Sequence, residues 1–133
     1  MGVLLVEIAF SQIKFFSSVA STTLAGNSGN NLLNASGLES TLVQGFQGDD
    51  SINLANASDE ALGGSGNDTI GFTSTGTQKA VVNGGLGNDS ITFLSATVFS
   101  STVTAGDGAD LITVGVAGDT DVISSMQIAA NQG

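Results

Sequence analysis

The residues best suited to chemistry in this chain are aspartates that follow glycines about every twenty residues. The motif reads GGSGNDTIG from Gly63, GGLGNDSIT from Gly84 and AGDGADLIT from Ala105. Weaker copies read GFQGDDSIN from Gly45 and GNSGNNLLN from Gly26, and successive copies start 19, 18, 21 and 21 residues apart. Self-similarity on this scale indicates a solenoid, in which each repeat is one coil stacked on the last.

The sixth position of the motif carries a carboxylate in four of the five copies. It holds Asn31, Asp50, Asp68, Asp89 and Asp110. Glycine turns let backbone carbonyl oxygens point into a shared space, and Ca²⁺ takes about six to eight oxygen ligands in proteins. Without a cation, the four carboxylates would form a column of like charges at roughly the 4.8 Å spacing of neighbouring strands.

Apolar residues alternate after each motif, as in a β-strand with one buried face. The eighth position holds Leu33, Ile52, Ile70, Ile91 and Ile112, and two residues later come Ala35, Leu54, Phe72, Phe93 and Val114. Two residues before each motif lies a second apolar row, made of Leu24, Val43, Ala61, Val82 and Val103. Each coil is therefore predicted to hold two short strands, and stacked coils give two parallel sheets that face each other across a thin core.

The predicted fold is all-β: a right-handed parallel β-roll or β-helix solenoid of about six coils of 18–21 residues. The repeats occupy residues 26–125, and Asp121 to Ser125 form a final half-coil. Residues 1–25 are interpreted as a degenerate first coil or cap, because Ile13 lies 20 residues before Leu33. The alternative is a helix, which the β-branched residues of this segment disfavour. Residues 126–133 are expected to form a less ordered tail.

The copies GGSGNDTIG and GGLGNDSIT resemble the nonapeptide of the RTX (repeats-in-toxin) family, and the resemblance covers residues 26–114. It implies a calcium-binding parallel β-roll in which sixth-position aspartates and turn carbonyls of neighbouring coils hold Ca²⁺. The implied ligands are Asp50, Gly63, Gly64, Gly66, Asp68, Gly84, Gly85, Gly87, Asp89, Gly106, Gly108 and Asp110.

The resemblance places the best sites between the turns of Asp68 and Asp89 and between those of Asp89 and Asp110. A third lies between Asp50 and Asp68, and Asn31 weakens any site in the first copy. The sequence departs from the family because the alternate half-coils lack the motif, which leaves at most one calcium column.

A purely structural role for the glycine turns stays open. Asn and Asp side chains can cap turns by accepting backbone hydrogen bonds, without any metal. The other acids, Asp59 with Glu60 and Asp119 with Asp121, are interpreted as solvated turn residues.

Composition excludes several classes of function. The chain has no cysteine and no histidine, so it lacks thiolate metal sites and the usual general base. A net charge of −10, with Lys14 and Lys79 as the only cations, disfavours nucleic acid as a partner. The sequence contains no run of eighteen apolar residues, so it predicts no membrane span. Tryptophan and tyrosine, the usual sugar platforms, are absent. The chain is therefore not expected to be an enzyme.

The expected function is that of a calcium-stabilised structural or assembly protein on a cell or particle surface. A virion decoration or tail component, an S-layer and an adhesin module all fit. No cleaved signal peptide is evident, since Glu7 interrupts the first apolar stretch. Expected partners are copies of itself or a shell protein, bound through apolar N-terminal residues. The apolar residues that exceed the needs of a thin core are candidates for such a contact, and burial of each in the core or cap of the chain is the open alternative; they are Val3, Leu5, Phe10, Phe16, Phe46 and Phe99.

Two alternatives remain open. The first is the repeat region of a secreted RTX toxin or enzyme. The second is a ligand-binding or ice-binding solenoid, since RTX-type ice binders resemble this repeat. Those ice binders align Thr and Asn beside the turn, however, and the third position here does not form such an array. It holds Ser28, Gln47, Ser65, Leu86 and Asp107.

Overall fold

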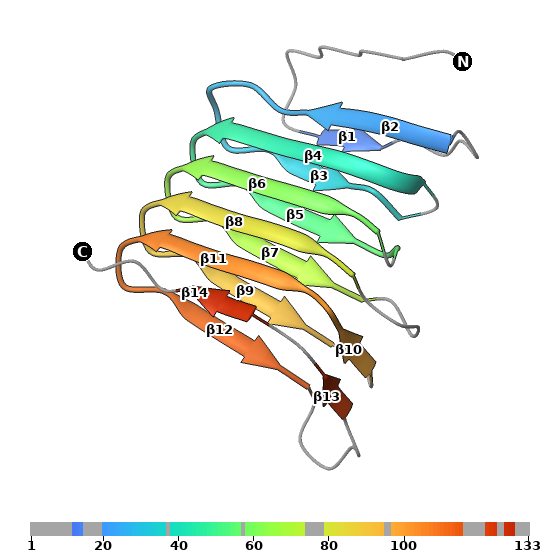
Figure 1. Cartoon of the computed structure of the whole chain (residues 1–133). Helices are drawn as coiled ribbons and strands as arrows, with labels where there is room; N and C mark the ends of the chain where they lie inside the picture. Colours follow the sequence, from blue (N-terminus) through green and yellow to red (C-terminus); the bar gives the residue numbers. More distant parts are fainter. Residues whose placement is uncertain are drawn as a thin grey trace.

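The chain folds into stacked β-coils. A computed structural model describes residues 12–14, 20–36, 38–56, 58–73, 79–94, 97–115, 122–124 and 127–129. These residues form strands and turns, and none belongs to a helix that could cross a membrane. The strands make two six-stranded parallel sheets and one two-stranded sheet (Figure 1).

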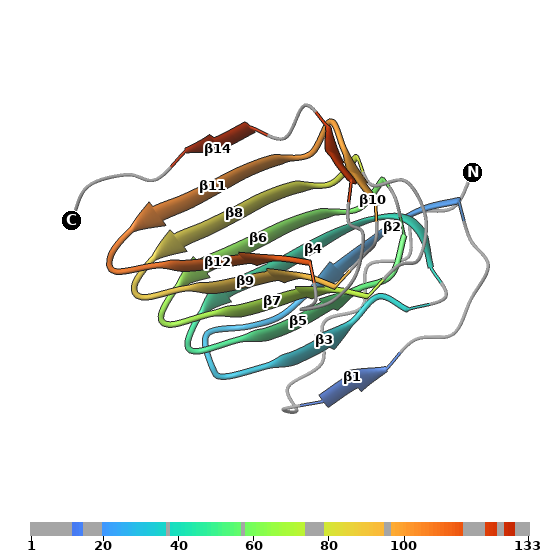
Figure 2. The same ribbon diagram turned by 90° about the horizontal axis from the view of Figure 1, so that it is seen from below.

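The two large sheets, termed sheet A and sheet B, lie face to face (Figure 2). In order, sheet A contains β1 (Gln12–Lys14), β3 (Leu32–Asn34), β5 (Ser51–Leu54), β7 (Thr69–Phe72), β9 (Ser90–Phe93) and β12 (Leu111–Val114). Sheet B contains β2 (Ala20–Ala25), β4 (Glu39–Gln47), β6 (Glu60–Ser65), β8 (Val81–Leu86), β11 (Thr102–Asp107) and β14 (Gln127–Ala129). The chain alternates between the sheets, and every glycine motif carries it from sheet B to sheet A.

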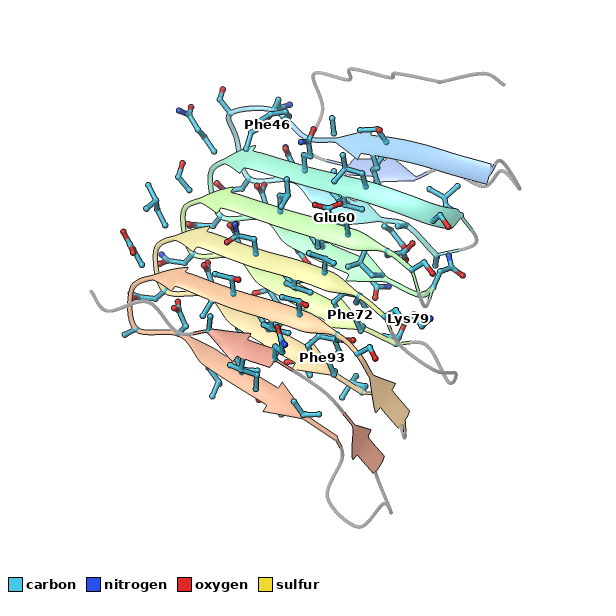
Figure 3. The ribbon with its side chains drawn as sticks, viewed as in Figure 1. Phe46, Glu60, Phe72, Lys79 and Phe93 are labelled. Atoms are coloured by element: carbon cyan, nitrogen blue, oxygen red, sulfur yellow. The ribbon has the colours of Figure 1, made fainter. Side chains whose placement is uncertain are left out.

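The core forms between the sheets because like residues stack in register. Ile52, Ile70 and Ile91 are direct partners in sheet A and are buried. Phe72 and Phe93 stack with ring centroids 4.6 Å apart and planes 5° from parallel (Figure 3). Sheet B contributes the row Leu24, Val43, Ala61, Val82 and Val103, all buried. These are the three apolar rows that the repeat predicts.

The predicted fold class is confirmed, although the solenoid has about four turns rather than six. The outermost strands β1 and β14 are only three residues long. Within residues 1–25, Ile13 pairs with Leu33 and β2 pairs with β4. The strand interpretation is therefore confirmed for residues 12–14 and 20–25, and the helix alternative is wrong there. The rest of that segment lies outside the described residues.

The C-terminal part continues the stack further than predicted. Val122–Ser124 form β13, which pairs with β10 (Thr97–Phe99) in the small sheet, as expected for a final half-coil. The prediction of a less ordered tail is wrong for Gln127–Ala129. These residues form β14 beside β11, because Ile128 extends the apolar row that ends at Val103.

Candidate metal centre at the glycine turns

The glycine turns stack along one edge of the solenoid, where the strands of sheet B end (Figure 1). Glycine is required at the first motif position because the turns approach each other closely. A Cβ atom on Gly63 would collide with the Asp68 carboxylate of its own turn and with the Gly84 carbonyl oxygen of the next. Gly45 and Gly84 meet the equivalent atoms. Each turn therefore brings a carboxylate oxygen and a carbonyl oxygen to the same small space.

The sixth-position aspartates reach backward along the solenoid. The Asp50 backbone N–H donates to Asp68 Oδ1 at 2.8 Å, and the Asp68 N–H donates to Asp89 Oδ1 at 2.8 Å. The same bond joins the Asn31 N–H to Asp50 at 2.7 Å and the Asp89 N–H to Asp110 at 2.8 Å. One oxygen of each aspartate thus caps the preceding turn, as the structural interpretation of the motif expects.

The fifth-position side chains reach forward instead. Asn67 Oδ1 accepts the Asn88 N–H at 2.8 Å, and Asn88 Oδ1 accepts the Ala109 N–H at 2.8 Å. Asn30 and Asp49 make the same bond to the next turn at 2.9 and 2.7 Å. We did not predict this second ladder, although its signal is visible in the sequence as Asn or Asp at four of the five fifth positions.

Both ladders end where the residue type changes. Asn31 Oδ1 accepts the Asn27 N–H of its own turn at 2.7 Å, and its amide donates to Asn27 Oδ1 at 3.1 Å. Ala109 has no side-chain oxygen to offer a sixth turn. The turn stack is therefore closed by Asn31 at one end, and its forward ladder stops at Ala109 at the other.

The second carboxylate oxygen of the inner aspartates has no hydrogen-bond partner. Asp50, Asp68 and Asp89 are 2%, 1% and 2% exposed, and the Oδ2 atom of each is buried and unpaired. Its neighbour at the first-position glycine is a carbonyl oxygen, which is also an acceptor. A buried acceptor beside another acceptor is costly unless a proton or a cation lies between them.

Electrostatics favour neutralisation of this column. Burial raises the pKa of Asp68 to about 6, the Asp50 N–H opposes that rise, and the charges of Asp50 and Asp49 add to it. Burial also raises the pKa of Asp89 to about 6, with the charges of Asp68 and Asp110 acting in the same direction. The pKa of Asp50 is raised for the same first reason. Neither of the two lysines of the chain belongs to these turns.

The donor set fits a hard cation that takes mostly backbone ligands. Each inner turn offers one free carboxylate oxygen, and the next turn offers a carbonyl oxygen beside it. Among the residues that the structure describes, no three acidic, histidine or cysteine side chains converge on one point. Backbone carbonyls would therefore have to complete the shell of any Ca²⁺, which the repeated glycines permit.

The structure brings the sequence-predicted ligands to one edge. The first-position residues Gly63, Gly84 and Ala105 place carbonyl oxygens beside the carboxylates of the preceding turns. The second- and fourth-position glycines stack on carbonyls of the preceding coil; they are Gly64, Gly66, Gly85, Gly87, Gly106 and Gly108. Asp110 is only half-buried, and its Oδ1 accepts from Asp89.

The opposite corner of the coils contradicts one prediction. Asp59 is 1% exposed rather than solvated, whereas Glu60 is exposed as expected. Asp59 Oδ1 accepts the Thr41 N–H at 2.8 Å and Oδ2 accepts the Asn56 N–H at 3.0 Å. Two coils later in the same column, Ser101 Oγ accepts the Ala80 N–H at 3.2 Å. Asp59 therefore ties two coils together, and burial raises its pKa despite these bonds. Asp119 and Asp121 lie outside the described residues.

Comparisons with protein-family models, with curated proteins and with solved structures gave no match to this chain. Any functional assignment therefore rests on the residues and geometry described above.

Proposed function

We propose that the chain is a non-catalytic structural module of a cell or particle surface, whose β-solenoid is stabilised by Ca²⁺ at the glycine turns. The observation that carries the proposal is the row of buried, unpaired Oδ2 atoms on Asp50, Asp68 and Asp89. Three bound Ca²⁺ ions would bring six positive charges and reduce the formal net charge from −10 to −4. Relief of this repulsion supports a role for calcium in holding the coils together.

The expected calcium affinity of these sites supports a location outside the cell. Sites built from few carboxylates and many carbonyls bind Ca²⁺ weakly, in the range of about 10⁻⁴–10⁻³ M that is typical of extracellular modules. Such sites fill in an extracellular medium rich in calcium. A rigid solenoid without a histidine or a cysteine supports a coat, spacer or decoration role better than a catalytic one.

The decisive experiment uses Asp68→Asn, which keeps an oxygen for the Asp50 N–H and supplies an amide donor for the unpaired side. In chelator we expect this variant to melt several degrees higher than wild type, because it removes a buried negative charge. In millimolar Ca²⁺ we expect the order to reverse, because wild type gains stability and the variant gains less. Thermal melts followed by circular dichroism measure both effects.

Asp49→Asn is the matched control, since it removes the same charge from an exposed side chain of the neighbouring ladder. Asn67 and Asn88 already occupy equivalent positions, so the forward ladder survives the change. We expect this variant to keep the calcium-dependent rise in melting temperature. A wild-type melt that is the same in chelator and in Ca²⁺ would leave the turns with a purely structural role.

A further inference from the structure

Across the five strands from β3 to β12, the outer face of sheet A carries two files of uncharged side chains. The first file runs Leu32, Ser51, Thr69, Ser90 and Leu111 across β3, β5, β7, β9 and β12. The second, two residues further along each strand, runs Asn34, Asn53, Gly71, Thr92 and Thr113. All ten residues are exposed or half-buried and alternate with the buried core residues.

Across β3, β5, β7, β9 and β12 this face is neutral in a protein of net charge −10, and β1 at the edge of the sheet adds one cation, Lys14, in register with Asn34. The described acids lie elsewhere, either at the glycine turns, as Asp49 and Asp107 do, or on the sheet B side, as Glu60 does. Among the outward positions of the five strands there is no charged residue. Two copies of the chain repel each other least when they meet through this face, because contacts through the other surfaces bring acidic side chains of both copies together.

The order of the first file is self-complementary. From β3 to β12 it reads Leu, Ser, Thr, Ser, Leu, so this run is the same in both directions along the solenoid axis; Gln12 of β1 lies beyond it, next to Leu32. A two-fold axis parallel to β7 and passing between two copies would set Thr69 against its own counterpart. The same axis would set Ser51 against Ser90 and Leu32 against Leu111, as an isologous interface requires.

The second file suits the same axis. Gly71 lies at its centre and would meet Gly71 of the other copy, which lets the two sheets approach closely. Asn53 would lie opposite Thr92, and Asn34 opposite Thr113. Each of these pairs joins an amide, which both donates and accepts hydrogen bonds, to a hydroxyl group that does the same.

We propose that the outer face of sheet A is a self-association surface. Its occupant is a second copy of the chain, packed face to face and antiparallel along the solenoid axis. The surface consists of the seventh and ninth motif positions, which lie in the strands of sheet A after the turns, and it uses none of the candidate calcium ligands, so the inference does not rest on calcium binding. It also differs from the apolar N-terminal contact that the sequence suggests, because its centre is polar and only its ends are leucine.

The contact is weak by area. Five strands about 4.8 Å apart and four residues of about 3.3 Å each give a face of roughly 300 Å². A stable interface buries roughly 800 Å² on each partner. We therefore expect association at protein concentrations of about 0.1–1 mM in solution, and reinforcement where many copies share one surface. Added salt should strengthen the association, because it screens the net repulsion and leaves a neutral contact intact.

The first test is sedimentation velocity across that concentration range, in buffered Ca²⁺ at which circular dichroism shows every variant folded. Thr69→Glu places two carboxylates together on the two-fold axis and should abolish the concentration-dependent shift. Thr102→Glu adds the same charge to an exposed position of β11 in sheet B and should leave the shift unchanged. A wild type that stays monomeric throughout, or two variants that behave alike, would overturn the proposal.

A second test fixes the geometry, because the chain has no cysteine of its own. With a bis-maleimide that spans about 10 Å, the usual distance between packed sheets, Thr69→Cys should cross-link to itself. Ser51→Cys and Ser90→Cys should cross-link far better when mixed than when alone, and Thr102→Cys should stay monomeric. Equal yields from all four positions would contradict the two-fold axis. Efficient links from Ser51→Cys alone would indicate a parallel arrangement instead and would equally refute it.

Discussion

At the scale of single residues, most side chains at the glycine turns obey the geometry of the repeat, and Phe46 does not. It holds the second motif position with φ at 80°, a left-handed conformation that later copies give to Gly64, Gly85 and Gly106. A side chain in this region costs roughly 1–2 kcal/mol. Phe46 is also 50% exposed and lies at the turn edge (Figure 3). The predicted contribution of Phe46 to a partner contact stays a prediction, and the observed features are its strained backbone and its half-exposed ring.

The strain at Phe46 predicts an inverted order of stability for two substitutions. Glycine in a strand is ordinarily less stable than alanine by roughly 0.5–1 kcal/mol. At position 46 we expect Phe46→Gly to be more stable than Phe46→Ala by about 1 kcal/mol, because only glycine relieves the left-handed backbone. Urea denaturation measures the difference. At the neighbouring exposed Gln47, Gln47→Ala should be more stable than Gln47→Gly. If alanine is also the more stable residue at position 46, the backbone of Phe46 is not strained.

At the scale of elements, the two ladders of the turn stack explain how coils of unequal length keep one register. Aspartates reach to the preceding turn and fifth-position residues reach to the next, so each turn is held from both sides. This arrangement destabilises the ionised aspartates, because the Oδ2 atoms of Asp50, Asp68 and Asp89 are buried in the turns without a hydrogen-bond partner. The elements are therefore aligned by groups that also destabilise them when they are ionised.

This destabilisation predicts an unusual pH dependence in chelator. The folded pKa values of Asp68 and Asp89 lie near 6, above the ordinary value of 3.8, so the folded state holds more protons than the unfolded state in that window. Stability then falls as pH rises from about 4 to about 6, since protonation of these groups favours folding. Melts at pH 4.5 and 7.5 should show the higher melting temperature at pH 4.5.

An Asp68→Asn, Asp89→Asn double variant is the control for this dependence. We expect its melting temperature to vary less between the two pH values, with the remaining change due to Asp50 and Asp59, whose pKa values are also raised. Millimolar Ca²⁺ should raise the wild-type melt mainly at pH 7.5, because a cation binds the ionised carboxylates. Wild-type stability that rises with pH in chelator would contradict the assignment of these carboxyls as the source.

The sequence predicts the elements wherever a residue type recurs from coil to coil. The aliphatic row at the eighth motif position and the glycine turns recur in all five copies, so period and burial together define the strands, the core and the edge of the candidate site. Asp59 has no such repetition, because its column reads Thr41, Asp59, Ala80 and Ser101. Its burial depends on contacts between coils that no periodic pattern records. The strand β14 was missed because only Ile128 carries the pattern there.

At the scale of the whole molecule, a solenoid is stabilised coil by coil, because each coil contacts only its neighbours. The described C-terminal end is the less covered part of the stack. Ile112 and Val114 are only half-buried, although their partners Ile91 and Phe93 are fully buried. Ile128 of β14 is 54% exposed although it continues an inward row. The apolar core is thus best sealed in the middle of the stack and thins toward β12 and β14.

This gradient predicts that the same truncation has different costs along one row. Ile91→Ala should lower the free energy of unfolding by about 2–5 kcal/mol, because it leaves a cavity between fully packed coils. Ile112→Ala should cost less, about 1 kcal/mol, since part of the Ile112 side chain is already open to solvent. Urea denaturation of both variants, in Ca²⁺ and below the concentration at which copies associate, compares the two losses. Hydrogen exchange should agree, with slower exchange in β7 and β9 than in β12. Equal losses from the two alanines would mean that the stack unfolds as one unit whose last coil is as well supported as its centre.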